Sequence, residues 1–190
     1  MVEAEAQGPV VEIGRRYLEK ALDILAREYG RALEYARAVV ADGLGDVAVA
    51  LLGGRPIGAE IFYKIRLAVD LCVHYYVAVL REYRRRGVGK ILITTVERAC
   101  KSDAYAATTT EDNAAAKALF GSLGYVGYRW RELDKKTRDV LLRATCGYDD
   151  DMIFLKGPAP REVAAEVGDA ERFGHRECYL VWLGVRRADV

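Results

Sequence analysis

Seven consecutive residues, Arg84-Arg85-Arg86-Gly87-Val88-Gly89-Lys90, are the part of this chain best suited to hold a charged ligand. They follow an apolar run that is typical of a β-strand and precede a helical pattern. Glycine lets a backbone approach a ligand closely, and the free N–H groups at a helix N-terminus bind phosphate oxygens. Arginine holds such oxygens through paired hydrogen bonds. The segment therefore predicts a site for a ligand that carries pyrophosphate.

Competing roles for the arginine-glycine segment fit its residues less well. A dinucleotide fingerprint needs a third glycine, which residues 87–92 lack. A Walker A loop needs glycine in place of Arg84 and serine or threonine in place of Ile91. A merely solvated basic run is unfavourable, because three arginines oppose the positive end of the helix unless an anion binds. A nucleic-acid patch remains the alternative, although a net charge of +1 gives no extended basic face.

The composition indicates a soluble globular protein. The 190 residues are 52% hydrophobic and 30% charged, enough for one domain with a sizeable core. The longest apolar stretch, residues 67–80, contains Asp70 and His74 and is too short to span a bilayer. The acidic start, residues 1–7, lacks the basic and apolar regions of a signal peptide. We therefore expect a cytoplasmic protein that binds neither a membrane nor nucleic acid.

The four cysteines, at positions 72, 100, 146 and 178, form no C-x-x-C pair, so no metal site is expected. The first expectation is buried free thiols. Disulfides are the alternative, because the chain has one asparagine, Asn113, and one glutamine, Gln7. Depletion of these thermolabile residues suggests a thermophile, in which intracellular disulfides occur.

Apolar periodicity and turn residues predict a mixture of strands and helices. Gly53-Gly54-Arg55-Pro56 predicts a hairpin turn. Strands are expected at residues 10–13, 47–52, 57–65, 71–80, 105–110, 128–133, 152–156 and 178–185, and helices at 18–29, 31–40, 114–122, 137–144 and 161–167. A further helix after the arginines would bury Val88, Ile91, Leu92, Val96 and Ala99. The mixture favours an α+β fold over a doubly wound parallel sheet.

The arginine-glycine segment resembles the signature of the GNAT N-acetyltransferase superfamily: Arg or Gln, two residues, Gly, any residue, then Gly or Ala. A second family pattern is matched, in the family's order and separation, by Asn113, Ala116, Phe120 and Gly124-Tyr125. Gly58 also stands where the family would place a glycine. The resemblance covers residues 10–157 and implies a mostly antiparallel central sheet, flanked by helices, in which two parallel strands splay apart. We expect a GNAT domain over residues 1–157 with a helical insertion at 134–151, and an extension, residues 158–190, packed on the same domain.

The resemblance implies acetyl-CoA as the donor and a primary amine, from a small molecule or a peptide, as the acceptor, by direct attack in a ternary complex. Val77 and Val79 would offer main-chain groups to the pantetheine arm, and Asn113 and Phe120 would flank the arm and its thiol end. The pyrophosphate would be wrapped by Arg84, Arg85, Arg86, Gly87, Val88, Gly89 and Lys90. The alternative role for Asn113 is to cap the helix that follows it.

The catalytic groups depart from the family pattern. Where members often have a tyrosine as acid, this chain has Phe120, so either the thiolate leaves unassisted, which we favour, or another tyrosine substitutes, or activity is reduced. Where some members have a glutamate as base, this chain has Val73. Candidates to assist are Glu60, His74 and Tyr75. Strand alternation points His74 to the face opposite Val73 unless a bulge intervenes.

Each candidate has an ordinary alternative: a solvent-facing strand carboxylate for Glu60, a satisfied sheet histidine for His74 and a core tyrosine for Tyr75. We therefore expect no dominant base and a proton that leaves through water held by these groups. The competing hypothesis for the whole chain is a non-catalytic acyl-CoA-binding module, whose insertion and extension serve a partner or a homodimer. The sequence does not identify the acceptor amine.

Overall fold

A computed structural model describes residues 8–29 and 33–180 of the chain. Its strands form one sheet in the order β1-β2-β3-β4-β5-β7-β6. Neighbouring strands are antiparallel except for β4 and β5, which are parallel. The strands are β1 (Val10–Ile13), β2 (Gly45–Leu52), β3 (Arg55–Arg66), β4 (Asp70–Val79), β5 (Ala104–Thr109), β6 (Val126–Arg129) and β7 (Met152–Lys156). The predicted mixed, mostly antiparallel α+β fold is confirmed.

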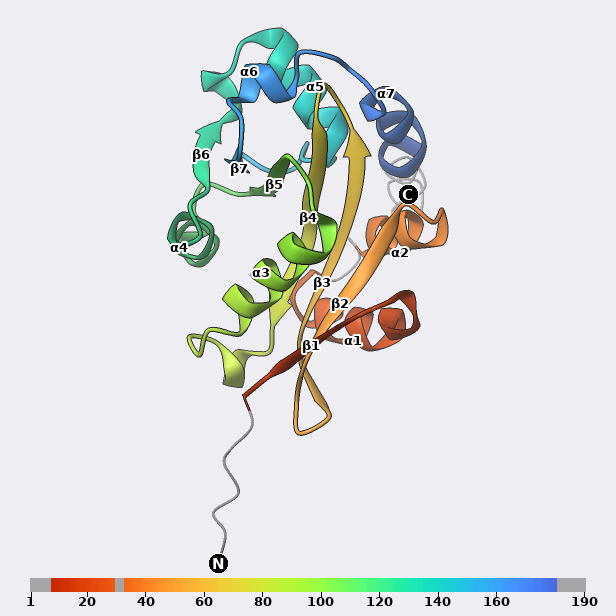
Figure 1. Cartoon of the computed structure of the whole chain (residues 1–190), viewed down its shortest axis with the longest axis vertical. Coiled ribbons are helices and arrows are strands. Elements are labelled where there is room, and N and C mark those ends of the chain that lie inside the picture. The colour runs from red at the N-terminus through yellow and green to blue at the C-terminus, as the bar shows by residue number, and fades with distance from the viewer. Residues whose placement is uncertain (1–7, 30–32, 181–190) are drawn as a thin grey trace, which may run out of the picture.

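Helices cover both faces of the sheet (Figure 1). They are α1 (Leu18–Tyr29), α2 (Leu33–Ala41), α3 (Val88–Cys100), α4 (Ala114–Ser122), α5 (Lys135–Thr145), α6 (Pro160–Val163) and α7 (Ala170–Phe173). The apolar stripe of α1, including Leu22 and Leu25, packs with Val49 and Ile61 on one face. On the other face, Leu92 of α3 packs against β2 and β3. Helices α1 and α3 therefore pack on the same strands, β2 and β3, from opposite faces of the sheet.

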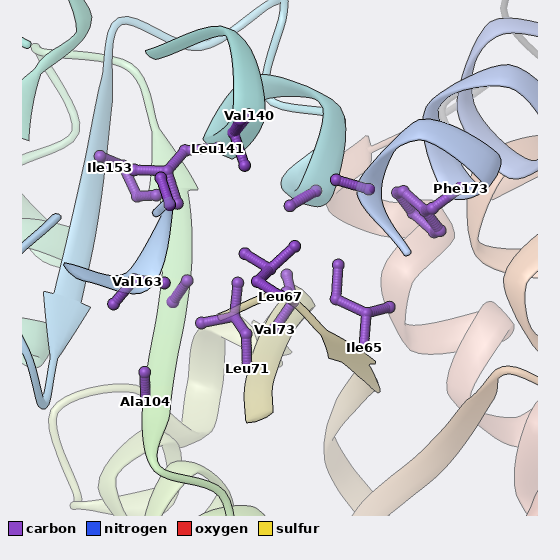
Figure 2. Packing of buried hydrophobic residues seen from close by; sticks show 14 of the residues in the cluster. Ile65, Leu67, Leu71, Val73, Ala104, Val140, Leu141, Ile153, Val163 and Phe173 are labelled. Atoms are coloured by element: carbon purple, nitrogen blue, oxygen red, sulfur yellow. The ribbon is translucent and has the colours of Figure 1, made fainter. Parts of the chain in front are cut away.

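The segments after β6 contribute to the main core. Figure 2 shows Leu141 of α5, Val163 of α6 and Phe173 of α7 gathered around strand residues such as Leu71 and Ile153, and all of these side chains are buried together. The Phe173 ring also stacks on Tyr63 of β3, with centroids 4.6 Å apart. These late elements thus stabilise the strands by burying their apolar surface.

The parallel strands β4 and β5 separate after a short pairing. They pair only from Leu71 opposite Ala104 to Val73 opposite Ala106. Beyond that point β5 pairs only with β7, and β4 pairs only with β3, as far as Val79. The remaining length of β4 therefore has an edge that faces no neighbouring strand of the described sheet.

A β-bulge interrupts β4 just past the last pair with β5. The register with β3 passes from Phe62 opposite His74 to Ile61 opposite Tyr76, which leaves Tyr75 as the additional residue. Because a bulge shifts the alternation, Tyr76 packs in the α1 cluster whereas Val77 packs in the cluster beneath α4. His74 precedes the bulge and stays on the α3 face of the sheet, whereas the Val73 side chain lies on the other face.

Several element predictions need correction. The strand predicted at 128–133 ends at Arg129, because Trp130–Glu132 turns into a 3₁₀ helix in which the Glu132 carboxylate accepts a 3.0 Å hydrogen bond from the Arg129 N–H. The helix predicted at 161–167 is shorter than expected, because α6 ends at Val163. The predicted last strand is wrong at its start, since Gly174–Leu180 is helical; residues 181–185 lie outside the described chain, as do residues 31–32 of the second predicted helix. Ala99 of α3 is exposed, and Ile93 is buried instead.

The expectation of free thiols is also wrong. Cys72 of β4 is bonded to Cys100 at the end of α3, and Cys146 after α5 is bonded to Cys178, with Cα–Cα distances of 6.3 and 5.6 Å. The parallel connection from β4 through α3 to β5 returns the chain beside its start, which brings the first pair together. None of the helices in the described ranges has the length and apolar character needed to cross a membrane.

Candidate active site

The predicted phosphate turn ends at an uncapped helix N-terminus. After β4 the chain makes a 3₁₀ turn, Arg81–Tyr83, and reaches Gly87, the N-cap of α3. Gly87 offers no side-chain cap, and the first turn of α3 contains no acidic residue. The first N–H groups of α3 are thus available to an external anion, and the helix dipole favours one there. The arrangement suits a phosphate group.

The two glycines of this turn differ in what a side chain would disturb. Gly87 has a φ of +80°, which a residue with a side chain rarely adopts, although a β-carbon there would meet no atom within 4 Å. Gly89 has no such φ, but a β-carbon on it would lie 3.3 Å from Cδ2 of Leu119 in α4. Arg85 also adopts a positive φ, 59°, a conformation that is costly for a residue with a side chain.

The three arginines are exposed but differ in what they contact. The Arg84 guanidinium donates to the Val79 carbonyl (Nε–O 2.9 Å) and forms an ion pair with Glu28 of α1. The Arg86 guanidinium lies 5.9 Å from the centre of the Tyr83 ring. Arg85, Arg86 and Lys90 therefore carry the positive charge that faces solvent, whereas Arg84 would have to leave Glu28 to reach a phosphate.

Val77 and Val79 direct main-chain groups towards the gap between β4 and β5. The Leu80 N–H donates to Ile57 of β3 (2.9 Å), so the neighbouring Val79 points its own N–H and carbonyl to the opposite edge. Val77 has the same parity, and its carbonyl accepts a 2.9 Å hydrogen bond from the Tyr29 hydroxyl of α1. The strand edge that the resemblance assigns to the pantetheine arm is thus the edge that β5 has left.

The second motif lies on the other wall of this gap. Asn113 caps α4: its Oδ1 accepts from the Ala116 N–H and its Nδ2 donates to the Thr109 hydroxyl, both at 3.0 Å. The capping role is therefore present, and contact of Asn113 with a ligand stays a prediction. Phe120 is 5% exposed and packs against Tyr125 and Phe154, with centroid distances of 5.1 and 5.6 Å.

Of the three candidates to assist the proton, two are buried together. Glu60 is not a solvent-facing carboxylate: it is fully buried, and its Oε1 lies 2.5 Å from Nδ1 of His74. Burial raises the pKa of Glu60, and the adjacent His74 partly offsets that effect. Tyr75 lies on the opposite face, with its ring against Tyr63 and Tyr76, and burial raises its pKa well above the usual value. The structure thus brings Glu60 to His74 and leaves Tyr75 apart.

The structure adds polar residues that sequence reasoning missed. Nε2 of His74 lies 2.7 Å from the Tyr125 hydroxyl, which donates to Glu97 of α3. Glu97 in turn forms an ion pair with Lys156 of β7. Tyr125 carried a signal, as the aromatic residue of the second motif, whereas nothing in the sequence marked Glu97 or Lys156. No cluster of three or more potential metal ligands occurs among the described side chains.

On the opposite face, an acidic loop lies near the bulge. The Asp150 side chain forms a hydrogen bond with Thr108 of β5, and burial raises its pKa. Thr108 stands two residues past Ala106, the last residue paired with β4, just as Tyr75 stands two past Val73. Asp150 therefore lies across the gap from the tyrosines of β4, a sequence-distant approach that no local pattern indicated.

The fold matches solved acetyltransferase structures at low sequence identity, which shows the fold alone. An acetyltransferase from Bacillus subtilis in complex with CoA has a TM-score of 0.58 and 15% identity over 80% of this chain and 100% of its own. An AAC(6')-Iy structure with a CoA–acetylneamine bisubstrate analogue has a TM-score of 0.52 and 21% identity over 62% and 90%. Arabidopsis thaliana Naa50, in complex with a CoA–peptide bisubstrate analogue, has a TM-score of 0.53 and 17% identity over 78% and 99%.

No curated protein matches the chain. The family model for the acetyltransferase (GNAT) family matches residues 15–125, which include the arginine turn, the separating strands and the second motif. With the fold, the glycine turn and the gap between β4 and β5 agreeing with that match, the chain belongs to the acetyltransferase (GNAT) family.

Proposed function

We propose that this protein transfers the acetyl group of acetyl-CoA to a primary amine by direct attack in a ternary complex. The observation that carries the proposal is the uncapped N-terminus of α3, with Gly87 and exposed arginines, at one end of the edge that β4 exposes after leaving β5. A pyrophosphate fits the N-terminus of α3, and an extended amide-bearing arm fits the exposed edge of β4, since both sites offer main-chain N–H groups.

The reaction requires a neutral amine, because an ammonium has no lone pair to attack the thioester carbonyl. As the amine attacks, the carbonyl oxygen becomes negative, and the outward N–H of Val79 is suited to stabilise it. The carbon–sulfur bond then breaks and the thiolate leaves. Phe120 cannot supply a proton, so we propose that the thiolate departs unassisted.

The acceptor is a primary amine of a small molecule or of a peptide. Two fold relatives were solved with bisubstrate analogues, one built on an acetylneamine and the other on a peptide, and both acceptor classes suit the proposal. The face of β4 opposite α3 is the approach we favour, because Asp150 and the Tyr75 ring would attract a cationic amine there.

The deciding experiment is turnover of acetyl-CoA with pooled amines and pooled peptides. Release of free CoA thiol, together with a product heavier by one acetyl group, is the expected result. The matched control is the Gly89→Glu variant, in which the cofactor turn is blocked. Binding of acetyl-CoA without acetylation of any amine would instead support the non-catalytic acyl-CoA-binding module, which Phe120 and the buried Val73 keep as the second candidate.

A further inference from the structure

Five polar side chains from five separate segments form one continuous chain of hydrogen bonds on the α3 face of the sheet. Glu60 of β3 contacts His74 of β4 (Oε1–Nδ1 2.5 Å), and His74 contacts the Tyr125 hydroxyl (2.7 Å). That hydroxyl contacts Glu97 Oε1 of α3 (2.7 Å), and Glu97 Oε2 contacts Nζ of Lys156 in β7 (2.8 Å). The Glu60 and His74 side chains are 0% exposed, Glu97 is 13% and Lys156 is 35% exposed. The chain thus runs from the core to the surface.

The direction of each hydrogen bond follows from the surface inward. An ammonium only donates and a carboxylate only accepts, so Lys156 and Tyr125 both donate to Glu97. Because the single hydroxyl proton of Tyr125 is committed to Glu97, its oxygen must accept a hydrogen bond from the Nε2–H of His74. Nδ1 then has one proton to share with Glu60 Oε1, on whichever of the two atoms that proton rests.

The inner end of the chain is open. Glu60 Oε2 is buried and has no hydrogen-bond partner among the described residues. Glu60 stands directly opposite Val77 in the register of β3 and β4, and the His74 ring lies 6.2 Å from that of Phe120. The resemblance assigns Val77 to the pantetheine arm and Phe120 to the thiol end of that arm. An unpartnered carboxylate oxygen therefore lies beneath the strand along which the pantetheine arm is expected, near the ring that borders its thiol end.

Among the described residues, the other groups facing the His74 imidazole are uncharged. Tyr105 of β5 stacks on it at 6.2 Å and commits its hydroxyl to the Glu97 carbonyl (3.1 Å), while Phe120 and the Tyr125 ring are apolar neighbours. The charges able to influence His74 are thus Glu60 on one side and Glu97, balanced by Lys156, on the other.

We propose that Glu60 and His74 store the proton released during acetyl transfer, and that the Glu97–Lys156 pair sets, through Tyr125, how firmly they hold it. This inference rests on the proposed function. The overall reaction converts an ammonium and a thioester into an amide, a thiol and one proton. In the storage step that proton, carried by water, forms an O–H bond at Glu60 Oε2. The shared proton then rests fully on Nδ1, which donates it in a hydrogen bond to Oε1.

The stored state has one net positive charge, an imidazolium beside a neutral carboxylic acid. The Tyr125 oxygen, polarised by its bond to ionised Glu97, faces this imidazolium. Glu97 and Lys156 are therefore positioning residues: they touch no substrate, and they act on the store with opposite signs. After product release the proton returns to solvent.

The test observes His74 directly. The chain has two histidines, so a His175→Asn background leaves His74 as the only imidazole in a ¹⁵N NMR titration of the protein without acetyl-CoA. Glu97→Gln removes the anion and should lower the pH of imidazolium formation by about one unit. Lys156→Gln leaves Glu97 uncompensated and should raise it by a similar amount. The control is Glu19→Gln on α1, which removes an exposed ion-pair partner of Arg37 on α2; it should leave the pH of imidazolium formation unchanged.

Opposite shifts are the decisive feature, because simple loosening of the structure would move both variants the same way. Shifts of the same sign, or none in either variant, would overturn the coupling. The reaction adds a second measurement: the store cannot accept a proton once it is already full, so the acid limb of kcat/KM should follow the NMR shifts, downward in Glu97→Gln and upward in Lys156→Gln. An acid limb that stays in place while His74 shifts would overturn the role in catalysis. Failure of every amine to react would reject the proposed function, with the NMR result still deciding the coupling.

Discussion

Gly89 of α3 lies against Leu119 of α4, so close that a β-carbon on the glycine would come within 3.3 Å of Leu119 Cδ2. The two helices flank the gap between β4 and β5, one beginning at the arginine turn and the other at Asn113. A side chain at residue 89 would therefore crowd Leu119 between α3 and α4, at the place where the cofactor is expected to enter.

Replacing either turn glycine by glutamate should abolish acetyl-CoA binding. In Gly89→Glu the β-carbon crowds Leu119, whereas in Gly87→Glu the φ of +80° becomes strained; in both, the new carboxylate repels phosphate. Isothermal calorimetry measures the affinity, which should also weaken with salt because phosphate contacts are electrostatic. Gly121→Glu is the control, since residue 121 is exposed on α4 and a β-carbon there meets nothing within 4 Å. Unchanged affinity in both turn variants would remove the site from this turn.

The sequence predicted the parts of the site that depend on local chain geometry. The arginine-glycine turn and the start of α4 at Asn113 are local features, because glycine conformation and helix capping act over a few residues. The burial of Glu60 was missed because both of its flanking segments are apolar, so the alternation of polar and apolar residues in β3 did not show which face was exposed to solvent. Residues such as Glu97 and Lys156 meet only after the whole sheet has formed, and no local pattern encodes their distance.

The bulge and the disulfides show the same limit. The bulge at Tyr75 is visible only as a change of register against β3, which depends on the partner strand. Likewise, cysteine spacing does not state which Cα atoms approach within bonding range. The strand predicted at the C-terminal end failed because Cys178 is held against the end of α5, where a helical segment can reach and pack.

Phe120→Tyr should fold, keep its affinity for acetyl-CoA and turn over at or above the wild-type rate. The ring volume barely changes, and a hydroxyl reaching the gap would stand where the family pattern has its acid. Steady-state kinetics and calorimetry measure the two quantities, with Phe154→Tyr as the control, since Phe154 stacks on Phe120 from β7. A severe loss of acetyl-CoA affinity in Phe120→Tyr would show that residue 120 does not border the thiol.

Removing each disulfide should lower the free energy of unfolding by about 3 kcal/mol, because each bridge closes a loop of the unfolded chain. The sequence separations of the bonded cysteines, 28 and 32 residues, are similar, so the two losses should be similar. Urea denaturation of Cys72→Ala/Cys100→Ala and Cys146→Ala/Cys178→Ala measures them. The control is denaturation of the wild type and both variants with reductant present, where the three curves should converge. Wild-type stability equal to that of both variants without reductant would mean that the bridges do not form in solution.

The last prediction concerns the proton that the amine must lose. Among the described side chains at the gap, neither candidate is an accessible base: His74 is enclosed between Glu60 and Tyr125, and burial raises the pKa of Tyr75 well above its usual value. A positioned base contributes about 10²–10⁴-fold. We therefore expect Glu60→Gln, His74→Ala and Tyr75→Phe each to lose about tenfold or less in kcat, with Glu60→Gln the most costly.

The pH dependence of kcat/KM tests whether the proton leaves through water or through a dedicated base. Loss of a proton from the amine makes kcat/KM rise with pH towards the pKa of the acceptor, so this upper part of the profile should move when amines of different pKa are compared. The lower acid limb, which reports filling of the Glu60–His74 pair, should stay in place in that comparison. His74→Ala leaves Glu60 without its buried partner, which should destabilise the fold by about 3 kcal/mol, so rates must be compared at a temperature where circular dichroism shows all variants folded. A thousandfold loss in one variant, with folding and acetyl-CoA affinity intact, would identify that residue as the base and contradict proton transfer through water.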